Sequence, residues 1–344
     1  MSIVHLLPIE PIEERYSADW RRWWPRALRA EGLDVQVIEG TSMHGAGRGD
    51  AIRHGQFLDA IDTHYYKATQ LAVAMRTLSR GQIRAGDAVV FLDGWNAAVE
   101  AFAYARQVAK IDFAIVLALH AGCWDPHDHL TQCALAPWAR HAERAWLTAA
   151  DRVLVATEFH RQLIEAYHGE AVDLRDRICV TGFPLELDEL DQYRGERQPI
   201  VVFPHRLAPE KRPELFQDIQ AAYCDRYREA LTPAIKWVRT QDGYTDKAAF
   251  YRLLGSASVA LSTAWQETWG IAQLEAWYLG ATPVVPDRLA YAELYPSSAR
   301  YNTVDEAVQL VHDGLHAPPL PFAPARDPRR AWRPIAESIR GVLR

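Results

Sequence analysis

The chain has 344 residues, of which 49% are hydrophobic and 24% are charged, and its formal net charge is −6. This length is sufficient for two domains with separate cores, and the composition is that of an ordinary globular protein. The acidic balance argues against a generally basic nucleic-acid-binding protein, although it leaves room for a local basic site. No apolar run reaches the ~18 residues that a membrane-spanning helix needs, so we expect no membrane span.

The cysteines are scattered along the chain and form no C-x-x-C pair. They are Cys123, Cys133, Cys179 and Cys224. The first residues have no signal-peptide pattern. We therefore expect reduced thiols and a cytoplasmic location.

The first half of the chain alternates short apolar runs with helical periodicity. The expected strands are Ser2–Leu7, Val35–Ile38, Ala88–Leu92, Phe113–Leu119, Arg152–Ala156 and Arg177–Val180. The expected helices are Glu13–Glu31, Gln56–Ser79, Ala97–Lys110, Leu135–Ala150 and Glu158–Tyr167. This alternation predicts a Rossmann-like α/β domain. The glycine-rich stretch Gly40–Gly55 is expected to be a flexible loop at the carboxyl end of a strand, where such sheets bind ligands.

A second alternating set follows in the other half. The polar, proline-containing stretch Thr181–Gln198 is expected to be a linker, and Ile200–Phe203 starts the new set, which ends near Tyr301. After a proline-rich extended segment, the pattern of Asp327–Arg344 predicts an amphipathic helix. We therefore expect domains at 1–185 and 186–326, followed by a C-terminal helix at 327–344.

Within the second half, the stretch 260–286 has the pattern strand, loop, helix, strand. The helix is expected to begin near Gly270 and to end at Gly280, which suits a position that requires positive φ. Glu267 precedes this helix and Glu275 lies inside it, with seven residues between them. Eight helical steps span at most ~12 Å.

The backbone N–H groups from Thr268 to Ile271 are expected to be free at the start of this helix, which makes an anion site. The segment could therefore hold sugar hydroxyls at one end, phosphate in the middle and ribose hydroxyls at the other. The alternative is an ordinary amphipathic helix with a chance pair of carboxylates.

This stretch resembles the donor-site motif of retaining glycosyltransferases of the GT-B fold, in the class that includes glycogen synthase and sucrose synthase. In that class a Glu is followed by Phe-Gly or Trp-Gly and, after seven residues, by Glu-Ala, an apolar patch, Gly and Pro-Val. The matching residues here are Glu267, Trp269, Gly270, Glu275, Ala276, Gly280, Pro283 and Val284. The resemblance implies an α/β protein with two Rossmann-like domains that face a cleft, an acceptor-side N-terminal domain and a C-terminal domain that binds the nucleotide-sugar. It also implies a C-terminal helix that crosses back to the first domain.

The same resemblance assigns roles to the donor-site residues. Glu267 would hold the donor sugar hydroxyls, Glu275 the ribose, and the amides at Gly270 and Ile271 the diphosphate. Such a donor is a nucleotide-sugar, with UDP-sugar the commonest case, and the class generally needs no metal.

Arg206 and Lys211 lie just after the strand that starts the second set. They match the Arg and Lys of the family's Gly-Arg-Leu…Glu-Lys-Gly segment, which clamp the donor diphosphate. His205 and Arg212 stand where the family has glycine, so the local backbone is expected to differ. The alternative is that Arg206 and Lys211 are two solvated surface cations.

Two residues of the first domain are also candidates. His120 directly follows the strand Phe113–Leu119, at a place where the family often has a His near the donor sugar and acceptor. A lone His at such a place is more often structural. Asp93 matches an Asp-Trp segment of the family and would orient an acceptor hydroxyl, or it caps the helix expected at Ala97. Thr157 resembles the family's Ser of a Ser-Glu pair, or is only a helix cap.

Departures from the family pattern limit these assignments. Pro8–Pro11 replaces the Gly-Gly loop that the family often has after its first strand, so donor contacts from that loop are in doubt. The stretch Cys123–His129 contains one cysteine, two aspartates and two histidines but lacks the spacing of known zinc sites. We expect no metal there.

For the acceptor, the stretches 8–20, 65–69 and 120–126 together resemble phage-encoded glycosyltransferases, several of which place sugars on hydroxymethylated pyrimidines in DNA. In that case the location would be the host cytoplasm. The first helix could track phosphates and stack a flipped base, or could keep its tryptophans in the core. Its arginines are Arg15, Arg21, Arg22, Arg26 and Arg29, and its aromatic residues are Tyr16, Trp20, Trp23 and Trp24.

Other functions stay open at this stage. The acceptor could be a cell-surface glycan, a lipid or a small metabolite instead of hydroxymethylcytosine in DNA. The fold also hosts sugar-nucleotide epimerases and non-catalytic donor-binding proteins. The segment Arg239–Tyr244, a candidate for reading the donor base, has no specific signature, and the sequence does not address the oligomeric state.

Overall fold

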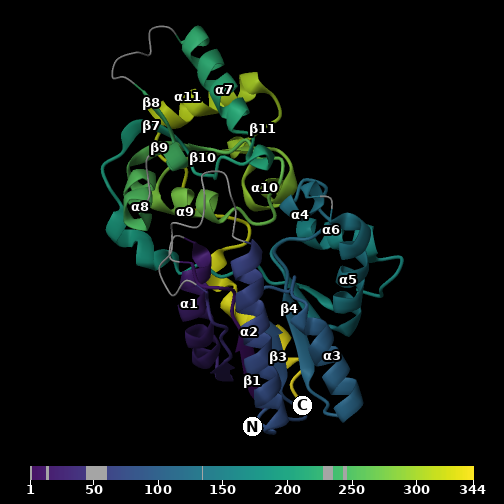
Figure 1. Ribbon diagram of the computed structural model, residues 1–344. Coiled ribbons are helices and arrows are strands. Elements are labelled where there is room, and N and C mark those ends of the chain that lie inside the picture. The colour runs from purple at the N-terminus through teal and green to yellow at the C-terminus, as the bar shows by residue number, and fades with distance from the viewer. Residues whose placement is uncertain (1, 13–14, 44–59, 134, 228–234, 243–245) are drawn as a thin grey trace. The chain divides into compact units, whose positions relative to one another are not determined.

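The structure is a computed structural model, which describes residues 2–12, 15–43, 60–133, 135–227, 235–242 and 246–344 (Figure 1). It divides into two compact units. Unit 1 comprises Met1–Pro184 and Arg330–Arg344, and unit 2 comprises Leu185–Arg329. Each unit has a parallel sheet covered by helices, which confirms the predicted α/β class. Most of the expected loop Gly40–Gly55 and the expected first turn of the helix from Gln56 lie outside the described residues.

The sheet of unit 1 has the order β2-β1-β3-β4-β5-β6, with every neighbouring pair parallel. Its strands are β1 (Ile3–Leu7), β2 (Asp34–Val37), β3 (Ala88–Phe91), β4 (Ala114–Ala118), β5 (Arg152–Val155) and β6 (Ile178–Val180). The chain runs from β1 outward to β2 and returns on the other side of β1 to form β3. The strand order therefore reverses between β1 and β3, and open α/β sheets bind ligands at the carboxyl ends of such strands.

Helices cover both faces of this sheet. They are α1 (Tyr16–Ala30), α2 (Ala60–Ser79), α3 (Ala98–Ala109), α4 (His129–Gln132), α5 (Ala136–Ala149), α6 (Glu158–His168) and α12 (Trp332–Arg340). On one face, buried side chains of α2, α3, α5 and α6 share a core with alternate residues of the strands, such as Phe91 and Leu117. Elsewhere α1 packs on α12, where the rings of Trp24 and Trp332 meet edge to face with centroids 5.5 Å apart.

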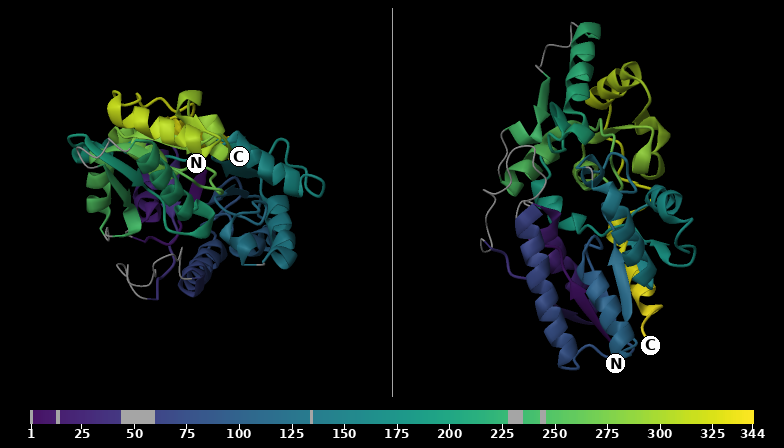
Figure 2. Two further views of the ribbon diagram at one scale, coloured as in Figure 1. Left: turned by 90° about the horizontal axis from the view of Figure 1, so that it is seen from above. Right: turned by 45° about the vertical axis from the view of Figure 1, so that its right-hand side comes forward.

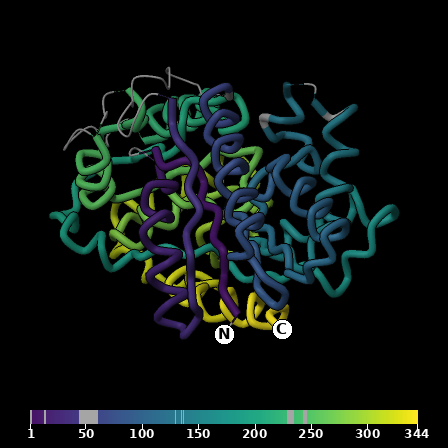
Figure 3. Tube along the Cα trace, turned by 60° about the horizontal axis from the view of Figure 1, so that its bottom comes forward, coloured from purple at the N-terminus to yellow at the C-terminus, as the bar shows by residue number. Residues whose placement is uncertain are grey.

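The C-terminal helix belongs to unit 1 although it follows unit 2 in the chain. On its predicted apolar stripe, Trp332, Ile335 and Ile339 are at most 9% exposed. Leu343, expected on the same stripe, lies beyond the helix end at Arg340 and is only partly buried. It contacts α1 and β5. The hydroxyl of Ser2 donates to the carbonyl of Arg344 over 2.8 Å, so the two ends of the chain lie side by side in every view (Figures 1 to 3).

Unit 2 has the sheet order β11-β10-β9-β7-β8, again with parallel neighbours. Its strands are β7 (Gln198–Phe203), β8 (Lys236–Arg239), β9 (Ala257–Leu261), β10 (Thr282–Pro286) and β11 (Arg300–Tyr301). The main core contains side chains of α7 (Pro213–Arg226) and α11 (Val304–His316). Towards the other face, α8 (Lys247–Ser256) and α9 (Ile271–Leu279) pack together and contact β9, and α10 (Leu289–Leu294) follows β10. The strand order reverses between β7 and β9.

The expected linker Thr181–Gln198 contains more structure than its polarity predicts. A 3₁₀ helix, η2 (Leu187–Tyr193), buries Leu187 and Leu190, because a spacing of three residues places both on one side of such a helix. The hydroxyl of Tyr278 bonds the carboxylates of Asp188 and Asp191 at 3.1 and 2.9 Å, which ties η2 to α9. The segment joins the two units, as expected of a linker, and its second part packs on α9 of unit 2. The other 3₁₀ helices are η3 (Pro209–Lys211), η4 (Thr240–Asp242), η5 (Ser297–Ala299) and η6 (Pro328–Arg330).

Candidate functional site

Three loops meet at the carboxyl edge of the unit 2 sheet. They follow β7 (residues 204–212), β9 (residues 262–270) and β10 (residues 287–288). The hydroxyl of Thr263 donates to the carbonyls of Lys211 and Arg212 at 2.9 and 2.8 Å, and the N–H of Trp265 donates to the carbonyl of Glu210 at 2.8 Å. The guanidinium of Arg288 donates to the carbonyl of Ala264 at 3.2 Å. The three loops are thus one connected structure at the point where the strand order reverses.

Lys211 and Glu267 form an ion pair in this structure, with Nζ 3.2 Å from Oε2. Their side chains are only 7% and 14% exposed. The ammonium group also donates to the backbone carbonyl and the side-chain oxygen of Gln266. Lys211 is therefore not a solvated surface cation. Burying either charge alone would cost much free energy, so a buried ion pair needs both its partner charge and additional hydrogen bonds.

Burial by itself would raise the pKa of Glu267. The positive charge of Lys211, the electrostatic influence of His205, the N–H of Trp269 and the bond from Lys211 outweigh it and lower the pKa to about 2. The carboxylate is therefore ionised at neutral pH and accepts hydrogen bonds without donating any.

The start of α9 differs in one respect from the expectation. Oε1 of Glu267 accepts the N–H groups of Thr268 and Trp269 at 3.1 and 3.3 Å, so these two amides are not free for an anion. The expectation that all amides from Thr268 to Ile271 are free was wrong for these two, because the Glu267 side chain folds back over its own loop. The amides of Gly270 and Ile271 donate to no acceptor in the described part of the chain.

Gly270 and Gly280 bound α9 in the left-handed region, with φ of +75° and +112°. The positive φ predicted for Gly280 is confirmed. At Gly270 a Cβ would lie 3.2 Å from the ring of Tyr291 and 3.4 Å from Cγ of Glu267. Glycine there lets the helix start come close to both side chains.

Arg206 and Glu275, the other predicted donor ligands, lie on the same unit. Arg206 forms an ion pair with Glu210, with its Nε 3.0 Å from Oε1. Glu275 lies on α9 and is 7% exposed. Its Oε1 accepts the hydroxyl of Tyr251 from α8 at 3.0 Å. Each of these two side chains has a hydrogen-bond partner within the protein.

His205, which stands where the resembling family has glycine, is buried behind Glu267. Its Nε2 shares a 2.8 Å hydrogen bond with Ser262, whose hydroxyl lies 2.8 Å from that of Tyr291. Burial, together with the charge of Lys211, lowers the pKa of His205 to about 3. The neutral imidazole therefore links the loop after β7 to the loop after β9. The sequence contains no signal for this role, because the partners are more than 50 residues away.

Arg212 also stands where the family has glycine, and its backbone adopts φ of +52°. This is a left-handed conformation that glycine favours, and the expected difference from the family's backbone at His205 and Arg212 stays a prediction. Its guanidinium lies over the ring of Trp265, 4.4 Å from the centroid. Trp265 and Arg288 were missed by the sequence reading. A large aromatic residue two positions before Glu267 and an arginine after the next strand were the available signals.

In unit 1, His120 lies just after β4 at the corresponding edge of the sheet. Its Nε2–H donates to the carbonyl of Leu92 at 2.7 Å, which fixes the tautomer and leaves Nδ1 as an acceptor. The ring lies among aromatic side chains, with centroids 4.4 Å from Phe183, 4.9 Å from Trp20 and 6.2 Å from Tyr16. Burial lowers the pKa of His120, so the ring is neutral at pH 7.

Asp93 follows β3 and forms an ion pair with Lys67 of α2, with Nζ 2.6 Å from Oδ2. Lys67 also donates to the carbonyl of Trp95 at 2.8 Å, and Asp93 accepts the N–H of Trp95 at 3.1 Å. Burial would raise the pKa of Asp93, but the charge of Lys67 and its hydrogen bond outweigh this and lower it. The sequence reading missed Lys67, because its partner is 26 residues away.

Two alternatives from the sequence concerned helix caps. Asp93 does not cap α3, because Asn96 accepts the N–H of Ala98 there at 2.9 Å; the cap alternative was wrong. Thr157 does cap α6, since its hydroxyl oxygen accepts the N–H of His160 at 3.1 Å.

The first helix does not present its tryptophans for stacking. Trp20, Trp23 and Trp24 are 1%, 6% and 0% exposed, and Trp20 donates to the carbonyl of Pro184 at 3.1 Å. Arg21 makes a two-pronged ion pair with Glu39, with both distances 2.6 Å. The interpretation that these three tryptophan rings stack on a flipped base is wrong. They lie on the apolar face of α1, which packs into the core of unit 1.

The acidic residues of the loop 123–129 serve its turns. Asp125 accepts the N–H of His127 at 2.9 Å, and Asp128 accepts the N–H of Leu130 at 2.9 Å. Within the described residues, no group of three or more metal-ligating side chains comes together. All four cysteines are free thiols.

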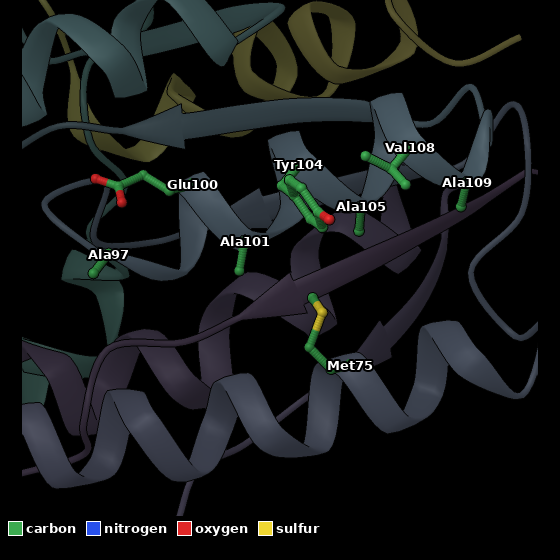
Figure 4. Close-up of a pocket in the computed structure, with 8 residues that line it drawn as sticks. All are labelled: Met75, Ala97, Glu100, Ala101, Tyr104, Ala105, Val108 and Ala109. Atoms are coloured by element: carbon green, nitrogen blue, oxygen red, sulfur yellow. The ribbon is translucent and has the colours of Figure 1, made fainter.

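Unit 1 also has an apolar surface groove between α2 and α3 (Figure 4). It is lined by Met75, Tyr104, Val108 and several alanines, with Glu100 at one end. The carboxylate of Glu100 accepts the indole N–H of Trp146 at 3.1 Å. None of the predicted site residues lines this groove. In the part of the chain that is described, no helix combines the length and apolarity that crossing a bilayer would require.

No protein-family model matches the sequence. The tRNA-queuosine alpha-mannosyltransferase of Drosophila melanogaster is 25% identical over 167 residues, which cover 43% of this chain. The matched part spans 42% of that relative, less than half of its length.

Solved structures match over the whole chain. Sucrose-phosphate synthase from Thermosynechococcus elongatus aligns with a TM-score of 0.60 at 13% identity, covering 100% of this chain and 95% of that one. The lipopolysaccharide outer core galactosyltransferase WaaB aligns with 0.56 at 14% identity, covering 100% and 94%. The catalytic domain of starch synthase IV from Arabidopsis thaliana, bound to ADP and acarbose, aligns with 0.55 at 11% identity, covering 100% and 98%. These likenesses confirm the predicted GT-B fold.

Proposed function

We propose that this chain is a retaining glycosyltransferase that moves a sugar from a nucleotide-diphosphate sugar to a hydroxyl group. One observation carries the proposal: Lys211 and Glu267 are held together beside the open amides of Gly270 and Ile271, at the carboxyl ends of β7 and β9. A departing diphosphate needs positive charge and N–H donors placed in advance, and a helix start at a reversal of strand order provides such a place.

The residues of unit 2 would act on the donor. The ionised carboxylate of Glu267 would accept hydrogen bonds from the donor sugar, and Glu275 would accept them from the ribose. Lys211, Arg206 and the two amides would stabilise the diphosphate as the bond between its oxygen and the anomeric carbon breaks. The acceptor oxygen forms its bond to the same face of that carbon, and its proton passes to the departing phosphate oxygen. This reaction depends on positioning and electrostatics.

In unit 1, His120 and Asp93 would face the reacting hydroxyls. A neutral His120 with its proton on Nε2 offers Nδ1 as an acceptor for a sugar or acceptor hydroxyl. Asp93, kept ionised by Lys67, would orient a second hydroxyl. Neither group is required to form a covalent bond to the sugar.

The donor base and the acceptor are the finer part of the proposal. The sequence resemblance favours a UDP-sugar as the donor. The proposed transfer requires no metal. For the acceptor we propose a hydroxyl on a modified base of a nucleic acid, with 5-hydroxymethylcytosine in DNA as the first case. A cytoplasmic location belongs to the same proposal.

A second acceptor is favoured by a specific observation. The name of the Drosophila melanogaster relative describes transfer of mannose to queuosine in tRNA. Queuosine in tRNA and 5-hydroxymethylcytosine in DNA share one chemistry, a hydroxyl on a base that has already been modified. A GDP- or UDP-linked hexose and queuosine-containing tRNA therefore belong in the same assay.

The test is nucleotide release from UDP-, ADP- and GDP-sugars, with hydroxymethylcytosine DNA, queuosine-containing tRNA, unmodified DNA and no acceptor. We expect release that depends on one of the modified nucleic acids, with a mass increase of that acceptor. Release with a glycan, lipid or metabolite acceptor alone would retain the transferase and reject the nucleic-acid acceptor. Donor binding without turnover for any acceptor, or conversion of the donor sugar itself, would favour a non-catalytic or epimerase-type protein.

A further inference from the structure

At the carboxyl edge of the unit 2 sheet, the guanidinium groups of Arg212 and Arg288 both lie over the ring of Trp265. The indole is 40% exposed. The guanidinium carbon of Arg212 lies 4.4 Å from the ring centroid, and that of Arg288 lies 5.8 Å from it. The two arginines come from different loops, after β7 and after β10. Stacking on an aromatic ring orients a planar guanidinium and leaves its N–H groups for other partners.

The charge balance at this edge is uneven. Lys211 pairs with Glu267 and Arg206 pairs with Glu210. Arg288 has no carboxylate partner in the described part of the chain. It donates to the carbonyl of Ala264, while the adjacent Asp287 pairs with Arg300.

Arg212 is only weakly compensated. Among the residues that the structure describes, its one carboxylate contact joins Nε to Glu214 at 3.4 Å, and solvent-accessible pairs of this kind contribute little. Partial burial and the positive charge of Arg212 both lower the pKa of Arg288. The fold thus holds two like charges near each other, and an anion that accepts hydrogen bonds from both would relieve their repulsion.

Unusual backbone angles occur in the same two segments as Arg212 and Arg288. Among the described residues, the non-glycine residues with positive φ are Lys110, Arg212 and Leu289. Two of these are Arg212 itself, at +52°, and Leu289, at +59°, which follows Arg288 and begins α10. A left-handed conformation is unfavourable for such a residue and persists only where the surrounding contacts enforce it. Both loops are therefore held in the conformation that brings Arg212 and Arg288 to the ring.

We propose that Arg212 and Arg288, oriented by Trp265, form a phosphate-binding subsite on unit 2 in addition to the Arg206–Lys211 set. Phosphate is the ligand class because its oxygens accept the paired N–H donors of guanidinium groups. The phosphate belongs either to the donor diphosphate or to the backbone of a nucleic-acid acceptor. Naming these sources rests on the proposed function, whereas the subsite itself requires only binding of phosphate.

The experiment measures the affinity of the full-length chain by calorimetry for two probes: nucleoside diphosphates (UDP, ADP and GDP) and a single-stranded DNA 12-mer. The variants are Arg212→Gly, Arg288→Gln and their combination. Arg212→Gly removes the guanidinium and also supplies the residue that suits the left-handed backbone, so a loss of binding does not reflect strain. Arg252→Gln, an exposed arginine on α8, is the control matched in charge. Thermal unfolding verifies that each variant is folded.

We expect the double variant to weaken one probe at least about 10-fold, with each single variant intermediate and Arg252→Gln within about twofold of wild type. Loss confined to the nucleoside diphosphates assigns the subsite to the donor. Loss confined to the 12-mer, with a smaller dependence of its affinity on salt, assigns it to the acceptor backbone. Unchanged affinity for both probes in the double variant, or wild-type chain that binds neither, overturns the subsite.

This outcome is separable from the proposed function, which is measured as sugar transfer. Arginine-dependent phosphate binding without transfer to any acceptor would leave the subsite and remove the function. Sugar transfer by the wild-type chain, together with unchanged phosphate affinities in the double variant, would support the proposed function and reject the subsite.

Discussion

At the carboxyl edge of the unit 2 sheet, the cationic side chains Arg206, Lys211, Arg212 and Arg288 gather beside an open helix start. At the carboxyl edge of the unit 1 sheet, Lys67 is matched by Asp93, and the neutral ring of His120 lies among aromatic side chains. Both edges follow from the same parallel α/β plan. The difference is that the first edge can receive negative charge, whereas the second offers acceptors for hydroxyl groups. In the function proposed above, the unit 2 edge would therefore bind phosphate and the unit 1 edge would bind hydroxyl groups.

The largest expected effect comes from removing the buried cation of unit 2. Lys211→Met leaves Glu267 without its ion-pair partner, and breaking a buried pair from one side costs about 3–5 kcal/mol. We expect sugar transfer to fall by ~10²–10³-fold, because the departing diphosphate loses a donor. Urea unfolding and kcat/KM measure the two effects. Adding Glu267→Gln should restore most of the stability but none of the activity; recovery of activity would remove the role in donor binding.

The second prediction concerns acid stability and tests the ionised state of Glu267. Its folded pKa of about 2 lies below the usual 4.5. Its contribution to stability is therefore fully present above pH 4.5 and is lost as the pH falls through 2. The linkage amounts to at most about 3 kcal/mol. Urea unfolding between pH 2 and 6 should show this slope in the wild type and a shallower one in Glu267→Gln. Equal slopes would contradict the ionised, paired carboxylate.

A smaller effect is expected at the edge of unit 1. Lys67→Met removes the charge that lowers the pKa of Asp93, so this pKa should rise. We expect transfer to fall by ~10-fold with a new acid limb in its pH profile, while nucleoside diphosphate affinity stays unchanged. Lys67→Arg, which keeps the charge, should recover most of the rate. A parallel loss of donor affinity would show that the pair supports the fold and does not position the acceptor.

The smallest effect serves as a structural reference. Thr157→Ala removes the cap of α6 and should cost ~1 kcal/mol of unfolding free energy. We expect kcat/KM per folded molecule to be unchanged, since Thr157 only holds the helix start. A decrease in kcat/KM at constant fold would give Thr157 a role in the site of unit 1.

The sequence was most informative where local rules act alone. The apolar runs located the strands of the first sheet and β7, β9 and β10 of the second, whereas β8 and β11 were not predicted. Glycine at position 280 predicted a left-handed helix end that the structure confirms. The stripe on α12 predicted which of its residues are buried. The fold class followed from the same periodicities and from the resemblance around Glu267. The sequence was least informative for polar partners, because the partners of Lys67 and His205 come from distant segments.

Chain order and periodicity by themselves determined two sets of parallel α/β units, the start and end of the acidic helix, and the residue types at the ends of the strands. Only the tertiary structure decided which charges meet. Glu267 forms an ion pair with Lys211 and accepts hydrogen bonds from two amides of its own loop. Asp93 forms an ion pair with Lys67 and does not cap a helix. Arg288 has no carboxylate partner among the described residues. The physical reason is that hydrogen bonds and ion pairs act over a few ångströms in space, whereas the sequence specifies only distance along the chain.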